Sequence, residues 1–188
     1  MGLGSGTQQL AVNPDGSFGF FFRSSYGYLG KASLDGNLLW MNKCEEINII
    51  GGLERATDGS GDYLLTNIHN IGGLAAFVVR VNQAAGGAVA AHQYTFPQKI
   101  FEIANNPWLA VHPDGDFSFL FSASESSSIP QDKFMVRCKP DGQPRWAWLL
   151  KSSNLFSTYL NANYTPGNGW LVTDYKEQGG AVEKNRLF

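Results

Sequence analysis

The side chains most able to do chemistry are spaced in ways that match no catalytic or metal-binding motif. The three histidines, His69, His92 and His112, are 23 and 20 residues apart and form no His-x-x-x-His pair. There is no Cys-x-x-Cys pair for zinc and no Gly-x-Ser-x-Gly elbow to expose a nucleophilic serine. We therefore predict no enzyme activity, with no catalytic residue, no cofactor and no metal site, and we expect each histidine at the surface or in a turn.

The aspartates stand at glycine turns rather than around a common centre. Five of them precede or accompany such a glycine: Asp15, Asp35, Asp58, Asp114 and Asp141. Aspartate is favoured there because its side chain bonds the backbone two residues on. The run 58–62 resembles the start of a calcium loop, but it lacks the glutamate that such a loop carries at position twelve. A turn is the better interpretation.

Exposed aromatic rings flanked by amide or acidic residues could bind sugars, because the ring faces are apolar and the neighbours pair with hydroxyl groups. The candidates for such a surface, or for a protein interface, are Trp108, Trp148, Tyr159, Tyr164 and Trp170. The competing explanation is that these aromatic residues fill the core between blades, and we favour it for each residue. Carbohydrate binding therefore remains an alternative.

Two tryptophans, Trp146 and Trp148, lie two residues apart in one apolar run. In a β-strand they project from the same face. They either pack on a neighbouring sheet or form a patch that faces a partner.

The elements that must position these residues recur along the chain. A first type of turn appears at Asn13–Gly16, Thr57–Gly59 and His112–Gly115, with a looser copy at Thr165–Gly169, at intervals of 43, 56 and 53 residues. A second type leads to tryptophan at Asp35–Trp40 and Asp141–Trp146, with a degenerate copy at Gly87–Ala91. An interval near fifty residues is typical of propeller blades. Each repeat is predicted to form four strands, since Asp-Gly turns between apolar runs favour hairpins.

The sequence accordingly predicts an all-β, β-propeller-like single domain over residues 1–188, with about four blades of four antiparallel strands. The blades are drawn at 8–46, 47–98, 99–153 and 154–188. Strands are expected near 8–12, 18–24, 27–34 and 37–43 in the first, and near 107–112, 117–123, 133–139 and 145–151 in the third. The last blade is expected to be incomplete, with strands at 161–164 and 170–173 and a third beginning at Asn185. Closure by the N-terminal strand, completion by another chain, and truncation of a longer protein all remain open.

Three segments, Leu34–Trp40, Phe77–Asn82 and Phe134–Gly142, together resemble a β-propeller repeat of bacterial and phage proteins. Its pattern is a Phe-Val-Val-Lys-Leu-Asp strand, an Asp-Gly turn and a Trp, and it is similar to PQQ-like repeats. The resemblance implies that Trp40 and Trp146 dock on the neighbouring blade. The second repeat departs from it with Ala91 at this place, so its junction is expected to be looser or filled from elsewhere.

The composition argues against two classes of partner, nucleic acids and membranes. A formal charge of −2 and scattered Lys and Arg give no field for a nucleic-acid backbone. No apolar segment suits a Sec signal or a membrane span, so we expect no membrane insertion. Cys44 and Cys138 are interpreted as two partly buried free thiols.

We interpret the chain as a non-enzymatic structural or interaction module in a larger assembly, with other protein subunits, copies of itself included, as partners. The specific version is a phage virion component, such as a tail, fibre or capsid-associated protein, in a virion or other extracellular particle. The alternative is a lectin-type propeller that binds glycans. Fold alone cannot choose between them.

Overall fold

The fold is that of a computed structural model, which describes residues 9–23, 26–44, 50–70, 74–94, 108–123, 132–150, 158–165, 169–178 and 181–187. In the last three strands the backbone alone is described. These residues form β-strands and no helix. The strand bounds are β1 Gln9–Val12, β2 Phe18–Arg23, β3 Gly27–Ala32, β4 Leu38–Cys44, β5 Ile50–Arg55, β6 Tyr63–Asn70, β7 Leu74–Val81, β8 Ala88–Tyr94, β9 Trp108–Val111, β10 Phe117–Ala123, β11 Asp132–Cys138, β12 Pro144–Leu150, β13 Thr158–Thr165, β14 Gly169–Gln178 and β15 Ala181–Leu187.

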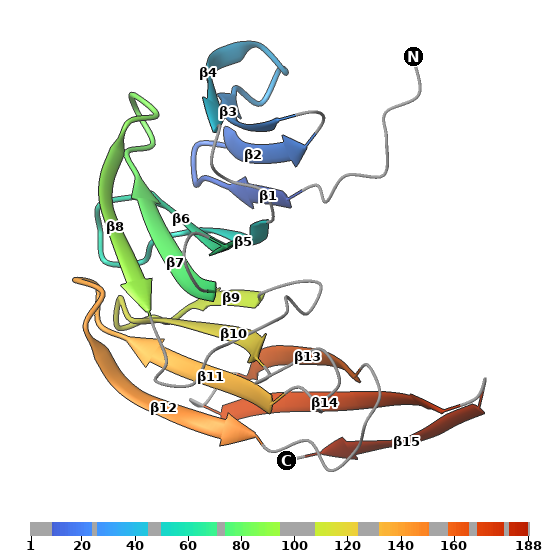
Figure 1. The fold of residues 1–188 in the computed structure, drawn as a ribbon. Helices are drawn as coiled ribbons and strands as arrows, with labels where there is room; N and C mark the ends of the chain where they lie inside the picture. Colours follow the sequence, from blue (N-terminus) through green and yellow to red (C-terminus); the bar gives the residue numbers. More distant parts are fainter. Residues whose placement is uncertain are drawn as a thin grey trace.

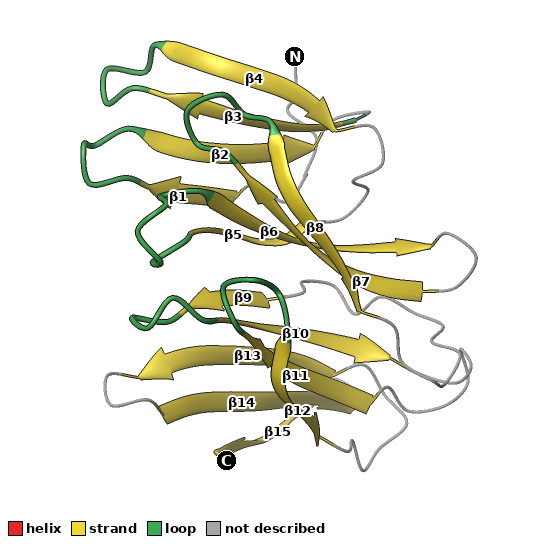
Figure 2. Cartoon of the chain, turned by 90° about the vertical axis from the view of Figure 1, so that its left-hand side faces the viewer, coloured by secondary structure: helices red, strands yellow, loops and turns green. Residues whose placement is uncertain are grey.

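The strands form four antiparallel meanders that follow one another in the sequence: β1–β4, β5–β8, β9–β12 and the three-stranded β13–β15. We call them the first to fourth sheets. The first strands of successive sheets lie side by side, β1 against β5, β5 against β9 and β9 against β13. Figures 1 and 2 show the sheets following one another from the first at the top to the fourth at the bottom, without closing into a ring.

The all-β class is therefore confirmed, and closure into a propeller is not observed. In the first and third sheets each strand begins and ends within two residues of its predicted position. The turn glycines explain this agreement. Gly16, Gly36, Gly115 and Gly142 all have φ between 79° and 87°, a conformation that glycine adopts without steric cost.

The prediction for the fourth sheet was wrong in part. Its third strand begins at Ala181 rather than at Asn185, and β14 runs on to Gln178 instead of ending near Thr173. The dipeptide 179–180, which lies outside the described residues, is Gly-Gly. Gly-Gly favours a two-residue hairpin loop, and this was the overlooked signal.

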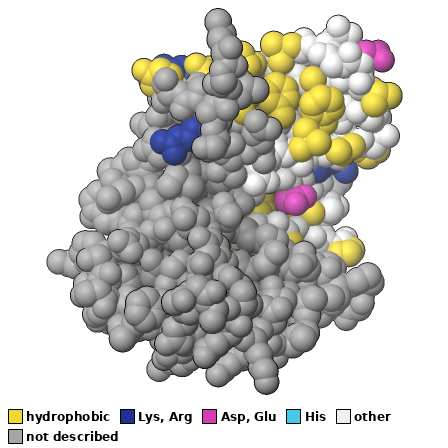
Figure 3. Space-filling view, turned by 90° about the vertical axis from the view of Figure 1, so that its right-hand side faces the viewer, with side chains coloured by type: hydrophobic (Ala, Val, Ile, Leu, Met, Phe, Trp, Pro, Cys, Tyr) yellow, Lys and Arg dark blue, Asp and Glu magenta, His cyan; other side chains and the backbone are white. Residues whose placement is uncertain are grey.

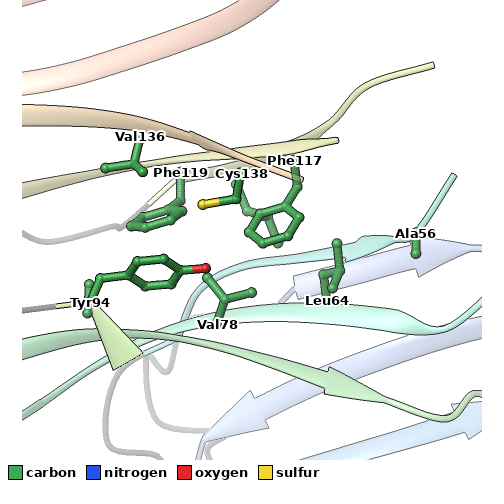
Figure 4. Close-up of a cluster of buried hydrophobic side chains, with 10 residues drawn as sticks. Ala56, Leu64, Val78, Tyr94, Phe117, Phe119, Val136 and Cys138 are labelled. Atoms are coloured by element: carbon green, nitrogen blue, oxygen red, sulfur yellow. The ribbon is translucent and has the colours of Figure 1, made fainter. Parts of the chain in front are cut away.

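Two apolar cores lie between successive sheets, so the first three sheets stabilise one another. The core between the first and second sheets contains Ala11, Phe21, Leu29, Leu53, Tyr63, Leu65 and Val81. The core between the second and third contains Ala56, Leu64, Ala76, Val78, Tyr94, Leu109, Phe117, Phe119, Val136 and Cys138. Figure 4 shows the Tyr94 ring between Val78 and Phe119 in this second core.

The turns bear out the structural interpretation for four of the five aspartates, Asp15, Asp58, Asp114 and Asp141. Asp15 accepts from the Ser17 amide at 3.0 Å, Asp58 from the Ser60 amide at 3.1 Å, and Asp141 from the Gln143 amide at 3.0 Å. Within the described residues no group of three or more His, Cys, Asp or Glu side chains could hold a metal ion.

The cysteines are free, as predicted: Cys44 is half-buried and Cys138 is fully buried. Burial raises the pKa of the Cys138 thiol to about 11, so the reactive thiolate is scarce at neutral pH. No helix in the part of the chain described here is long and apolar enough to cross a membrane.

Candidate functional site

The first sheet docks on the second through two side chains of its outer strand, β4. The indole N–H of Trp40 donates to the Gln83 carbonyl at 2.9 Å, and the Asn42 side-chain amide donates to the Gly86 carbonyl at 2.8 Å. Both acceptors belong to the turn between β7 and β8. Gly86 has φ +73°, and a Cβ added there would lie 2.7 Å from the Trp40 ring. Glycine is therefore needed for its conformation and for the close approach of Trp40.

The second sheet docks on the third in a similar way with different residues. The Tyr94 hydroxyl donates to the Gly142 carbonyl at 2.8 Å. A Cβ added at Gly142 would lie 2.4 Å from the His92 ring. The guanidinium of Arg80 donates to the Pro140 carbonyl at 3.2 Å. Pro140 and Gln83 are equivalent, because each is the second residue of its turn. The bond from Arg80 to the Pro140 carbonyl therefore replaces the bond that Trp40 makes to the Gln83 carbonyl at the junction of the first and second sheets.

The position assigned to the missing tryptophan was off by one residue. Trp40 pairs with Lys31 and Trp146 pairs with Arg137, whereas the equivalent Arg80 pairs with Ala90 and not with Ala91. The physical reason is the turn between β7 and β8, which is one residue longer than its counterparts. An open groove of about 510 Å³ lies beside Ala91, between β8 and β12.

The two tryptophans of β12 stack on each other. The rings of Trp146 and Trp148 lie 4.6 Å apart with an interplanar angle of 23°, so they share one face of β12 as the spacing predicted. Trp148 is 53% exposed. It is equivalent to Asn42 and His92, the residues that reach the turn glycine of the next sheet.

The side chains of the other aromatic candidates lie outside the described residues. Trp108 begins β9, and Tyr159 belongs to β13. Tyr164 on β13 pairs in register with Trp170 on β14. Their predicted roles in an interface or in glycan binding stay predictions.

The outer face of the first sheet, which points away from the second sheet, repeats the buried face of the third. Strand register makes Leu10, Val12, Phe18 and Phe20 equivalent to Leu109, Val111, Phe117 and Phe119. In the third sheet Leu109 and the two phenylalanines are at most 3% exposed because the second sheet covers them. In the first sheet, by contrast, Leu10 is 59% and Val12 is 63% exposed.

The outer face is continuous across its four strands. Phe18, Phe20, Phe22 and Tyr28 form a ladder of rings with successive centroids 6.3, 6.2 and 5.1 Å apart. Met41 on β4 is 45% exposed at the far edge. Figure 3 shows hydrophobic side chains gathered on the upper part of the molecule, where Figure 1 places the first sheet. Contiguous apolar faces of this kind are uncommon on monomeric proteins and are typical of surfaces that bind another molecule.

Sequence reasoning missed this face because Leu10 and Val12 looked like ordinary strand residues. Leu10-Ala11-Val12 and Leu109-Ala110-Val111 are the same tripeptide before the same type of turn. Only the structure shows that the first copy is exposed and the second is covered by a neighbouring sheet.

Acidic turn residues and arginines form two equivalent clusters at one end of the sheets. Arg137 donates to Asp116 at 2.9 Å and to Asp114 at 2.6 Å, and Arg145 donates to Asp116 at 2.6 Å. In the second sheet Arg80 pairs with Asp58 and Asp62 in the same way. Each of these carboxylates pairs with an arginine, which favours a structural role for both clusters.

A serine and a histidine form a hydrogen-bonded pair that has the chemistry of a nucleophile and a base. His112 Nε2 and Ser118 Oγ are 2.8 Å apart, but both side chains are fully buried. Burial, followed by the nearby Arg137, lowers the pKa of His112, so the ring is neutral at pH 7. No substrate can reach the pair without opening the core. His112 therefore lies in a turn, as predicted, but not at the surface.

Glu54 on β5 gives the fold a pH dependence that can be measured. Burial raises the pKa of its carboxyl from 4.5 to about 7. Because the folded state holds the proton more tightly, the stability from this group is full below pH 4.5 and is lost as pH rises through 7.

We expect Glu54→Gln to have little effect below pH 4.5 and to stabilise the fold by up to about 3 kcal/mol above pH 7, since each pKa unit corresponds to ~1.4 kcal/mol. Urea unfolding of both proteins across this range measures the difference. A difference that does not change with pH would contradict the raised pKa.

Comparison with known proteins supports the fold alone. No family model and no curated protein matches the chain. Among solved structures, a protein of unknown function from Bacteroides caccae matches 97% of this chain with a TM-score of 0.57 and 11% sequence identity. This chain spans 61% of the length of that protein. The similarity is one of architecture.

Proposed function

We propose that the chain is a non-enzymatic interaction module that takes up a β-sheet of another protein subunit on the outer face of its first sheet. One observation carries the proposal: Leu10, Val12, Phe18 and Phe20 repeat, position by position, a face that is buried against a sheet elsewhere in the chain. The same side chains in the same register suit the same kind of occupant.

The arrangement of the incoming sheet follows from the existing junctions. It would lie before β1 as the first sheet lies before the second, with its first strand beside β1. This extends the series of sheets in a propeller-like order. We therefore retain the propeller prediction in this form: the incoming sheet acts as one more blade before the first sheet and covers the exposed face.

The virion and lectin interpretations rest on less. Placement in a phage tail, fibre or capsid has no further support beyond the sequence resemblance, and it stays a prediction. Repeated glycan pockets would need like residues at equivalent places. The equivalent positions 42, 92 and 148 carry Asn, His and Trp, which favours protein docking over a repeated sugar site.

Val12→Asp tests the proposed function. An apolar sheet face without its partner drives reversible self-association, which sedimentation velocity detects as species larger than the 20.6 kDa monomer. Burial of valine contributes about 1.5 kcal/mol or more, and ~1.4 kcal/mol is tenfold in affinity, so we expect association to weaken at least tenfold.

Val89→Asp is the matched control. Val89 is 57% exposed, close to the 63% of Val12, but it lies on β8 of the second sheet. It should leave association unchanged. A wild-type chain that stays monomeric at every concentration, or equal effects of the two substitutions, would contradict the proposed function.

A further inference from the structure

The turns that join the third and fourth strands of the first three sheets each contain a glycine with positive φ, but they differ in what covers it. Gly36, Gly86 and Gly142 have φ values of 82°, 73° and 83°. Gly86 and Gly142 are buried under side chains of the preceding sheet, whereas Gly36 is exposed. A Cβ added at Gly36 would meet nothing within 4 Å. Among the described residues, no side chain packs on the glycine of the first sheet.

Each covered turn offers two carbonyl groups to the sheet before it. The acceptors are the second residue of the turn and its glycine, and the donors are side-chain N–H or O–H groups: Gln83 and Gly86 accept from Trp40 and Asn42, and Pro140 and Gly142 accept from Arg80 and Tyr94. In the first sheet the equivalent acceptors are the carbonyls of Leu34 and Gly36. Within the part of the chain that the structure describes, no group donates to either of them.

The Gly36 turn adjoins the outer face of the first sheet. Leu34 is 74% exposed, whereas the equivalent Gln83 and Pro140 are half-buried. A Cβ added at Gly16 would lie 3.4 Å from the Leu34 side chain, so Leu34 lies against the turn that precedes Phe18 of the outer face. Figure 2 shows the turn between β3 and β4 at the top of the molecule, at the end of the series where the first sheet lies. A sheet that covers the outer face therefore also reaches this turn.

We propose that the outer strand of the incoming sheet docks on the Gly36 turn, and that this strand carries an aromatic side chain together with N–H or O–H donors. The ring packs on Gly36, and the donors bond the carbonyls of Leu34 and Gly36. Aspartate and glutamate do not fit this place, because an ionised carboxylate accepts hydrogen bonds and donates none. The inference rests on the proposed function, which brings a sheet of another subunit to this face. It adds the side-chain chemistry that the outer strand of this subunit must have.

A chain with one added sheet tests the contact. An extra copy of residues 9–49, which contain the first sheet and its connection to the second, is inserted before Gln9. We call this protein the extended chain. Trp40 and Asn42 of the added sheet then meet the Gly36 turn of the original first sheet, as the original pair meets the Gly86 turn.

Gly36→Ala in the original sheet is expected to lower the urea midpoint further in the extended chain than in the wild-type chain. Only in the extended chain would the new Cβ collide with a docked ring, as it would at Gly86. Because such overpacking is costly, we expect the additional loss in the folding equilibrium constant to be about tenfold or more.

Two controls show whether the ring causes the difference. Trp40→Ala with Asn42→Ala in the added sheet should remove the additional loss, since no docked side chain is left for the new Cβ to meet. Val89→Asp, on β8 of the second sheet, should have the same effect in both chains. Circular dichroism checks that every variant is folded.

Val12→Asp in the original sheet separates this inference from the proposed function. Val12 is 63% exposed in the wild-type chain, and the added sheet would cover it in the extended chain. If Val12→Asp costs more in the extended chain but Gly36→Ala costs the same in both, the contact at the turn is wrong and the proposed function stands. If neither substitution costs more in the extended chain, both proposals are overturned.

Discussion

Gly86→Ala is expected to destabilise the chain by about 3 kcal/mol, whereas Gly36→Ala is expected to cost about 1 kcal/mol. Both glycines have positive φ at the same place in equivalent turns, so the backbone cost of alanine is shared. Only at Gly86 would the new Cβ also collide with the Trp40 ring at 2.7 Å and the Asn42 amide at 2.5 Å. Those contacts are the junction between the first and second sheets.

Urea unfolding of the two variants and of wild type measures how much the junction contributes to the free energy of unfolding. The backbone strain of alanine in the turn is common to both variants and cancels in their difference. Gly142→Ala is a second variant of the Gly86 kind, since its Cβ would lie 2.4 Å from the His92 ring. Equal losses of stability at Gly36 and Gly86 would show that the docking of outer strands on turns contributes nothing to the fold.

Asp116→Asn is expected to destabilise the fold by about 3 kcal/mol, because it leaves two arginines around a buried group that no longer carries charge. The Asp116 side chain is 1% exposed and accepts hydrogen bonds from Arg137 and Arg145. Asp114→Asn is the matched control. Asp114 pairs with the same Arg137 but is 55% exposed, so its loss should cost under about 1 kcal/mol.

The pH dependence of unfolding gives the same test a second measurement. Burial raises the pKa of Asp116, but its bonds with Arg145 and Arg137 outweigh burial and hold the pKa below the usual 3.8. The stability from this group is therefore present above pH 3.8 and is lost as pH falls through the lower folded pKa. Asp116→Asn should lack that acid-dependent loss. A variant that loses stability in acid as wild type does would contradict the assigned role of Asp116.

The strands and turns could be predicted from the sequence because their causes are local. Asp-Gly and Pro-Asp-Gly fix the turn backbone, and aromatic or β-branched runs fill the strands between them. The error at the missing tryptophan has a local cause too. The turn after β7 has one more residue than its counterparts, and only strand pairing shows that Ala90, not Ala91, faces Arg80.

The candidate site depends on contacts that no local pattern contains. Leu10 and Leu109 have the same neighbours in sequence, but only Leu109 is covered by another sheet. Likewise, nothing local to Arg80 indicates that it bonds the Pro140 carbonyl in place of a tryptophan. The sequence predicted that Trp146 and Trp148 share a strand face. That Trp148 is exposed could be learned only from the arrangement of the sheets.

The central claim is that the outer face of the first sheet is an interface, and hydrogen–deuterium exchange at low and high protein concentration tests it most directly. We expect peptides from β1 and β2 to gain protection as concentration rises, because Leu10 and Val12 become covered. Peptides from β8, with the similarly exposed Val89, should stay unchanged. Exchange in β1 and β2 that does not depend on concentration, or protection that rises equally in β8, would contradict the claim.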